Sequence, residues 1–178
     1  IDSLRENKVM SLKTRFGNLG NILDFDNLAE ENIYVLDSPI LTNSQFKKFK
    51  KFFSKKIKVI DCTFDIQNSL KDRIEAIREE AETAVREGST CIVLSDKDFS
   101  SQKASIPSIL TVGAVHSHLV KHGLRGYCSL NVECSDAMDT HSFAILIGVG
   151  ATTVNPYLAI DSIYQRFEKK LFGKSDFE

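Results

Sequence analysis

Short apolar runs alternate with longer amphipathic runs through most of this sequence, and this alternation limits the possible folds more than any other feature. The short runs are rich in β-branched residues and predict strands at 58–64, 90–95, 128–133 and 152–155. The longer runs carry apolar residues at helical spacing and predict helices at 70–87, 107–122, 140–147 and 156–171. Such alternation builds right-handed βαβ units around a parallel sheet. The predicted fold is α/β, as either part of a (β/α) barrel or a doubly wound sheet.

The beginning of the chain lacks this regular pattern. Residues 1–42 are predicted to form an irregular arm, with a short helical pattern over 4–12. Thr42 or Asn43 is then well placed to cap a helix over 44–53.

Length and composition indicate one folded domain over residues 1–178, with its α/β core in residues 43–178. The formal net charge of -1 provides no general attraction to nucleic acid or to an anionic membrane, and no apolar run is long enough to cross a bilayer. The four cysteines form no CxxC pair and lie in apolar stretches, so we expect buried, reduced thiols and a cytoplasmic location. Because the sequence opens with Ile1 and not Met, we expect a fragment of a larger multidomain chain.

The strongest local charge feature is the segment 47–58, which holds seven lysines, no acidic residue and several phenylalanines. Lysines interleaved with aromatic residues are typical of surfaces that bind single-stranded nucleic acid. At helical spacing, however, Phe46, Phe49 and Phe53 form one apolar stripe and the lysines form its solvated back. We therefore predict a helix packed on the core, and no nucleic-acid partner.

Polar residues follow each predicted strand, at the sheet edge where parallel α/β proteins bind their ligands. The main candidates are Asp96, Glu133, Asn155 and Tyr157, and Thr63, Asp65, Ser95 and Ser135 lie at the same edge. These groups can serve acid–base chemistry or a phosphate-bearing ligand, or they can simply cap helices and satisfy loop backbones. We favour the structural role and expect no catalytic residue. The four candidates are expected to be interdomain contacts or the relic of a binding site.

Two further patterns lack the residues that their chemistry needs. His118 and His122 have HxxxH spacing, but Leu119 stands where a zincin has its glutamate, so no metal site is predicted. The run Gly148-Val149-Gly150-Ala151 lacks the continuation of a phosphate-binding loop and fits a tight connection better. That interpretation treats 140–147 as a helix, although its apolar end is also compatible with a buried strand.

Whole phrases of the second half resemble one known family. They are IVLSD at 92–96, IPSILTVGAVHSHL at 106–119, GLR at 123–125, HSFAILIGVGA at 141–151 and VNPYLA at 154–159. In order and spacing they are similar to the central domain of the large subunit of glutamate synthase. The likeness is strong over 88–160 and looser before it, through residues 2–6, 20–23 and 38–41. Lys97, Ser117, Ser142 and Val149 depart from the family's usual residues.

The resemblance implies a function that no motif of this chain supplies. Glutamate synthases convert glutamine and 2-oxoglutarate to two glutamates, with an amidotransferase domain and an FMN-bearing (β/α) barrel that also holds an iron-sulfur cluster. The central domain has a fold related to that barrel and connects the two. We therefore expect a connector without its own cofactor, inactive alone, with those domains and an electron-donor subunit or ferredoxin as partners. The alternative is a stand-alone flavin- or phosphate-binding module.

Overall fold

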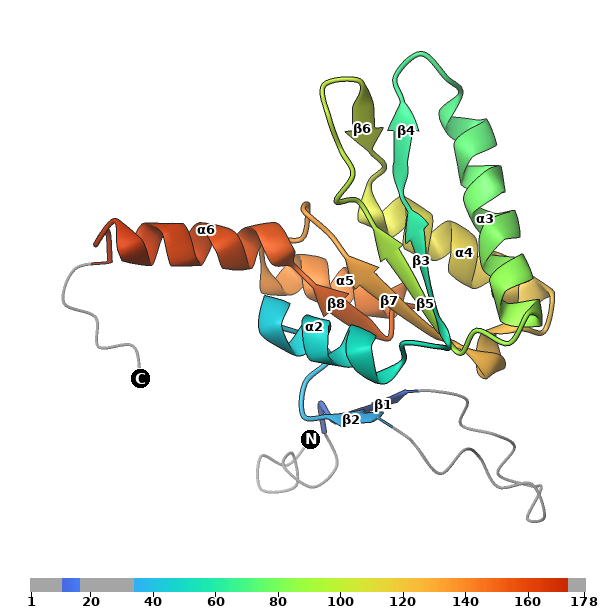
Figure 1. Cartoon of the computed structure of the whole chain (residues 1–178), viewed down its shortest axis with the longest axis horizontal. Coiled ribbons are helices and arrows are strands. Elements are labelled where there is room, and N and C mark those ends of the chain that lie inside the picture. Colours follow the sequence, from blue (N-terminus) through green and yellow to red (C-terminus); the bar gives the residue numbers. More distant parts are fainter. Residues whose placement is uncertain (1–10, 17–33, 173–178) are drawn as a thin grey trace.

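The structure is a computed structural model that describes residues 11–16 and 34–172. Its centre is a parallel sheet with the strand order β3-β5-β7-β8, all paired in register (Figure 1). The strands are β3 (Ile57–Asp61), β5 (Cys91–Ser95), β7 (Ser129–Glu133) and β8 (Thr153–Asn155). The helices are α2 (Asn43–Phe52), α3 (Leu70–Arg86), α4 (Ser108–Lys121), α5 (Thr140–Gly148) and α6 (Tyr157–Glu168), with a 3-10 turn η1 (Arg125–Tyr127). The predicted α/β fold is confirmed, including the helix over 140–147.

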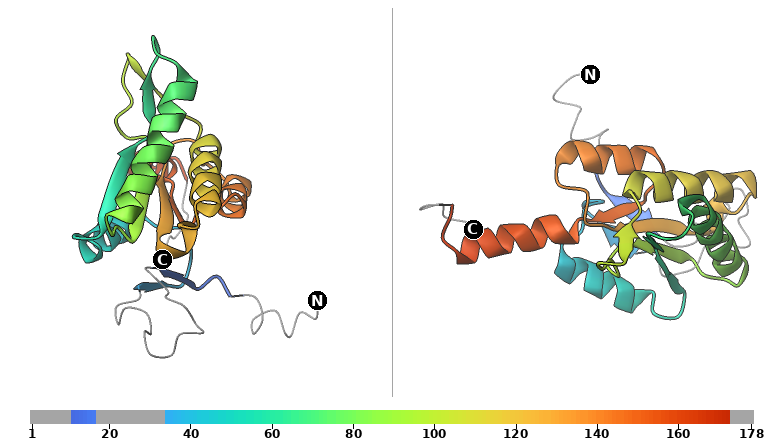
Figure 2. Two further views of the ribbon diagram at one scale, coloured as in Figure 1. Left: turned by 90° about the vertical axis from the view of Figure 1, so that its right-hand side faces the viewer. Right: turned by 90° about the horizontal axis from the view of Figure 1, so that it is seen from above.

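The two faces of the sheet pack against different elements. Alternate strand residues such as Ile92 and Leu94 face a core shared with α3, α4 and α5. The intervening Cys91 and Val93 face a second core made by α2 and the N-terminal segment. Figure 2 shows α4 and α5 on one side of the sheet and α2 on the other.

The strand order rises along the sheet without a reversal, and α3, α4 and α5 share one face. A doubly wound sheet has a switch point where the order reverses, and the described strands contain none. In its strand order the sheet resembles half of an eight-stranded (β/α) barrel. Helix α2 covers the face that a closed barrel would turn inwards.

The predicted strand over 58–64 is wrong in one respect, because it forms two strands that separate at Cys62. The second, β4 (Thr63–Asp65), leaves the parallel sheet and pairs antiparallel with β6 (Lys103–Ser105). Strand β6 lies within 96–105, between the strand predicted at 90–95 and the helix predicted at 107–122, where the sequence analysis predicted no element. Three-residue strands are too short to give a periodic signal, and β4 turns to this partner because β5 ends at Ser95.

The N-terminal arm is more regular than predicted where the structure describes it. Strands β1 (Thr14–Phe16) and β2 (Tyr34–Leu36) pair antiparallel beneath the body of the domain (Figure 1). The helical pattern predicted over 4–12 falls almost wholly outside the described residues. Thr42 is confirmed as the cap of α2, because its side chain accepts a hydrogen bond from Gln45 and the Gln45 side chain accepts one from the Thr42 backbone.

The predicted apolar stripe of α2 is confirmed. Phe46, Phe49 and Phe53 are buried, and Phe49 is completely so. The Phe49 ring lies 5.3 Å from the ring of Phe16 and 5.8 Å from that of Tyr34, so the stripe packs against the β1–β2 pair. All four cysteines are buried free thiols, as expected. None of the helices among the described residues is long and apolar enough to span a membrane.

One tight connection ties η1 to the end of α5. Arg125 donates hydrogen bonds to the carbonyl oxygens of Cys128 and Gly150, at 2.6 and 2.9 Å, and to the ring of His116 at 3.2 Å. Gly150 has a φ of +122° and lies so close to His116 that a Cβ atom there would be 2.3 Å from the ring. The predicted role of the Gly148–Gly150 segment as a tight loop into β8 is thus supported by its backbone geometry.

Candidate functional site

Glu133, the last residue of β7, is the centre of a charged network at the carboxyl end of the sheet. Only 3 % of its side chain is exposed. Its Oε2 accepts from Lys50 Nζ at 3.0 Å and from the Ser95 hydroxyl at 2.9 Å, while Oε1 accepts from Lys97 Nζ at 2.7 Å. A carboxylate at this depth is stable when it is paired in this way.

This pairing leaves Glu133 poorly suited to act as a base. Burial by itself raises the pKa of Glu133, but the hydrogen bonds from Lys97 and Lys50 outweigh burial and the pKa is lowered. Both carboxylate oxygens are occupied by donors of the same chain. Glu133 therefore holds β7, β5 and α2 together at this edge.

The pH dependence of stability tests this account of Glu133. Because the folded pKa is lowered below 4.5, the ionised group stabilises the fold above that pH, and the contribution is lost as the pH falls through the folded pKa. Glu133→Gln should reduce the free energy of unfolding at pH 7 by about 1.5–3 kcal/mol. The difference from the unsubstituted chain should shrink in urea titrations below pH 4.5.

Glu75 provides the control for that experiment, since its pair with Arg78 lies on the surface with half of the Glu75 side chain exposed. Glu75→Gln should change the free energy of unfolding by less than about 0.5 kcal/mol. An equal effect of Glu133→Gln at pH 3 and pH 7 would contradict the proposed ionised network.

Asp96 lies beside this network and is tied to two serines. It is 2 % exposed, and its Oδ2 accepts from the Ser105 hydroxyl at 3.0 Å and from the Ser135 backbone and hydroxyl at 2.9 and 2.5 Å. Its Oδ1 and the buried Tyr157 hydroxyl have no hydrogen-bond partner among the described residues. Burial raises the pKa of Tyr157, and the nearby Asp96 carboxylate raises it further, so this phenol stays protonated.

Asn155 points to a different neighbour. Its side-chain amide donates to the carbonyl oxygen of Leu41 and to the Asn43 side chain, both at 2.9 Å. It therefore fastens the end of β8 to the start of α2. Both bonds are made within the domain, and the structural role of the strand-end residues stays a prediction.

The structure thus brings together three of the four main candidates, Asp96, Glu133 and Tyr157, and separates the fourth, Asn155. Lys97 makes the link, because its Nζ is 2.7 Å from Glu133 and 4.8 Å from the centre of the Tyr157 ring, which lies near Asp96. Asn155 belongs to the contact with α2. Lys50 was wrongly placed on the solvated back of α2, although its spacing of four from the buried Phe46 was a signal for the edge of the apolar stripe.

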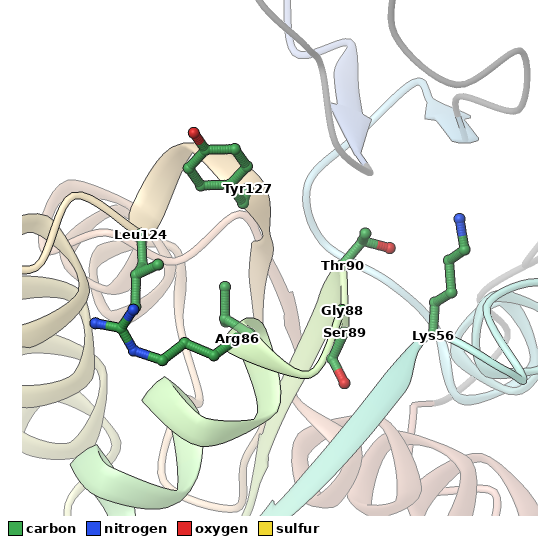
Figure 3. A pocket seen from close by; sticks show the side chains of 8 residues that line it. Lys56, Arg86, Gly88, Ser89, Thr90, Leu124 and Tyr127 are labelled. Carbon is green, nitrogen blue, oxygen red and sulfur yellow. The ribbon is translucent and has the colours of Figure 1, made fainter.

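A pocket of about 550 Å³ lies at the opposite, amino end of the strands. Its lining includes Lys56, Arg86, Thr90, Leu124 and Tyr127. Figure 3 shows that the Arg86 and Lys56 side chains run in different directions, with their charged ends far apart. Since the Arg86 and Lys56 side chains do not converge on a common point, the pocket is not arranged to bind a small anion between them.

The fold and the strand-end network together define a barrel-like parallel α/β domain whose ligand edge is closed by its own side chains. The sequence matches the glutamate synthase central domain family over residues 1–177. The chain belongs to this family.

Individual relatives agree with this assignment. The chain is 48% identical over 181 residues to the large chain of glutamate synthase [NADPH] from Azospirillum brasilense, covering 100% of this chain and 12% of that protein. It is 39% identical over 173 residues to the chloroplastic ferredoxin-dependent glutamate synthase of Spinacia oleracea, covering 93% of this chain and 10% of that protein. The chain spans roughly a tenth of the length of these relatives.

Proposed function

We propose that this domain is a connector in a glutamate synthase, where it holds an amidotransferase domain and an FMN-binding domain in register. The observation that carries the proposal is the closed strand-end edge, in which Glu133 and Asp96 are bound by lysines and serines of the same chain. Barrel enzymes have their active sites at the carboxyl ends of the strands. In this domain the same edge is filled by internal hydrogen bonds and ion pairs, which suits a structural role. The domain itself then contributes no catalytic residue and no cofactor.

Exposed apolar residues on α6 support a role at a domain interface. This helix projects away from the sheet (Figure 1), and Ile163, Tyr164 and Phe167 on it are each more than half exposed. Apolar surface of this kind marks contact with another protein surface. The remaining nine tenths of the relatives' length accommodates such neighbours.

The chemistry of the complete enzyme follows from the family. The two partner domains convert glutamine and 2-oxoglutarate to two glutamates, with FMN and an iron-sulfur cluster held outside this domain. NADPH or ferredoxin, which the relatives' names mention, supplies the electrons. The cytoplasm remains the predicted location, and four buried free thiols are compatible with its reducing conditions.

A domain replacement tests the connector role. This chain would replace the corresponding 12% of the Azospirillum brasilense large chain, to which it is 48% identical. We expect a chimera that still makes glutamate from glutamine and releases little free ammonia. Ile163→Asp in the chimera should increase ammonia release per glutamine consumed, while glutaminase activity remains, because the charge disturbs the apolar contact of α6. The neighbouring exposed Gln165→Asp is the matched control.

Unchanged ammonia retention in the Ile163→Asp chimera would contradict the contact through α6. The alternative function, a stand-alone flavin module, predicts that the isolated chain binds FMN. Tight stoichiometric binding in an FMN titration followed by flavin fluorescence would overturn the connector proposal.

A further inference from the structure

Two histidines and one glutamate meet on the outer surface of the domain, where α3 and α4 pack side by side (Figure 2). Glu82 comes from α3, and His118 and His122 come from the end of α4 and the residue that caps it. The spacing of four places both histidines on one helix face, with ring centres 4.4 Å apart. Sequence reasoning found the histidine pair but not the carboxylate, because Glu82 lies 36 residues from His118.

The three side chains are already close enough to share one small ion. His118 Nε2 is 2.6 Å from Glu82 Oε2, and His122 Nδ1 is 3.6 Å from Glu82 Oε1. One ligand atom from each residue lies within 4.8 Å of the others. Ligands at about 2.0 Å from a tetrahedral zinc ion are roughly 3.3 Å apart, so adjustments of about 1–1.5 Å bring all three into range.

We propose that Glu82, His118 and His122 form a binding site for a divalent transition-metal ion, most suitably zinc. Two imidazoles and a carboxylate are the protein ligands of many three-ligand zinc sites. The site is open to solvent on one side, since 36 % of the His122 side chain is exposed. The ion joins α3 to α4 by bonds that neither helix makes alone.

The surroundings of Glu82 and His118 prepare them to act as ligands. Arg86 donates to Glu82 Oε1 at 2.9 Å and orients the carboxylate. The His118 ring is held by its 2.6 Å hydrogen bond to Glu82 and by the His122 ring beside it, and its buried Nδ1 has no partner among the described residues.

Cobalt substitution tests the site directly. Addition of Co²⁺ to the purified chain should give the visible absorption of a four- or five-coordinate ion at one equivalent, and Zn²⁺ should displace it. Zn²⁺ should also raise the melting temperature, because the ion binds the folded chain. His122→Ala and Glu82→Gln should each weaken Zn²⁺ binding by at least about tenfold in a competition assay with a chromophoric chelator.

Matched variants separate this site from other ligands of the chain. His141→Ala, which removes an exposed histidine at the start of α5, should leave Zn²⁺ binding unchanged. Because the four free cysteines are buried, we expect them not to bind the added ion. His118→Ala also removes an interhelix hydrogen bond, so its fold must first be verified by circular dichroism; the exposed His122 carries the test independently.

Three outcomes would overturn the proposal. They are Co²⁺ absorption typical of a hydrated octahedral ion, Zn²⁺ binding that is equal in His122→Ala and the unsubstituted chain, and a loss of binding in His141→Ala as large as that in His122→Ala.

Discussion

Phe49→Ala should reduce the free energy of unfolding by about 3–5 kcal/mol, the largest stability loss that we expect from a single core substitution here. The side chain is fully buried, and its ring contacts those of Phe16, Tyr34 and Phe53. Removal of the ring opens a cavity between α2 and the β1–β2 pair, and the second core loses its centre. Urea denaturation followed by circular dichroism measures the change.

Phe52→Ala is the matched control, because the same residue type in the same helix is 47% exposed. It should cost clearly less, since truncation of an exposed ring leaves no enclosed cavity. Equal losses for the two variants would contradict the assignment of Phe49 to the core.

Gly150→Ala should also destabilise the domain strongly, by about 3 kcal/mol or more. Two costs act together. A φ of +122° is a conformation that alanine rarely adopts, and the new Cβ atom would lie 2.3 Å from the His116 ring. That ring is held by Arg125, which also binds the Gly150 carbonyl oxygen, so a shift of His116 disturbs the whole connection. The melting temperature and the urea midpoint should both fall.

Gly148 makes the comparison decisive. It is the last residue of α5, and a Cβ atom there has no other atom within 4 Å. Gly148→Ala should be neutral or should stabilise the chain by up to about 1 kcal/mol, because alanine favours helix. A loss in Gly148→Ala as large as that in Gly150→Ala would refute the steric argument.

The parallel core was predictable because its signals are local and repeated. The run from Cys91 to Leu94 is apolar throughout, as a strand buried on both faces must be, and the helix over 70–87 carries its apolar residues at a regular spacing. The family resemblance over residues 88–160 added the function that such patterns do not contain.

Contacts between segments that are distant in the sequence could not be predicted. Strands β4 and β6 contain three residues each, and α3 and β5 lie between them in the sequence. The bond from Lys50 to Glu133 joins residues 83 positions apart. The segment 47–58 holds seven lysines, and the sequence does not indicate which of them reaches a buried carboxylate. Glu82 was missed as a neighbour of the histidines for the same reason.

The order of the strands also affects how the domain forms as it leaves the ribosome. Each strand of the parallel sheet pairs with the one made just before it, so the sheet can grow in the direction of synthesis. The start of α2 must wait, because Asn43 bonds to Asp161 and to Asn155, and the Leu41 carbonyl oxygen also accepts from Asn155. We therefore expect α2 to be fixed in place only after residue 161 has emerged. Packing of α2 on the face of the sheet that carries Cys91 and Val93 is then the final step of folding.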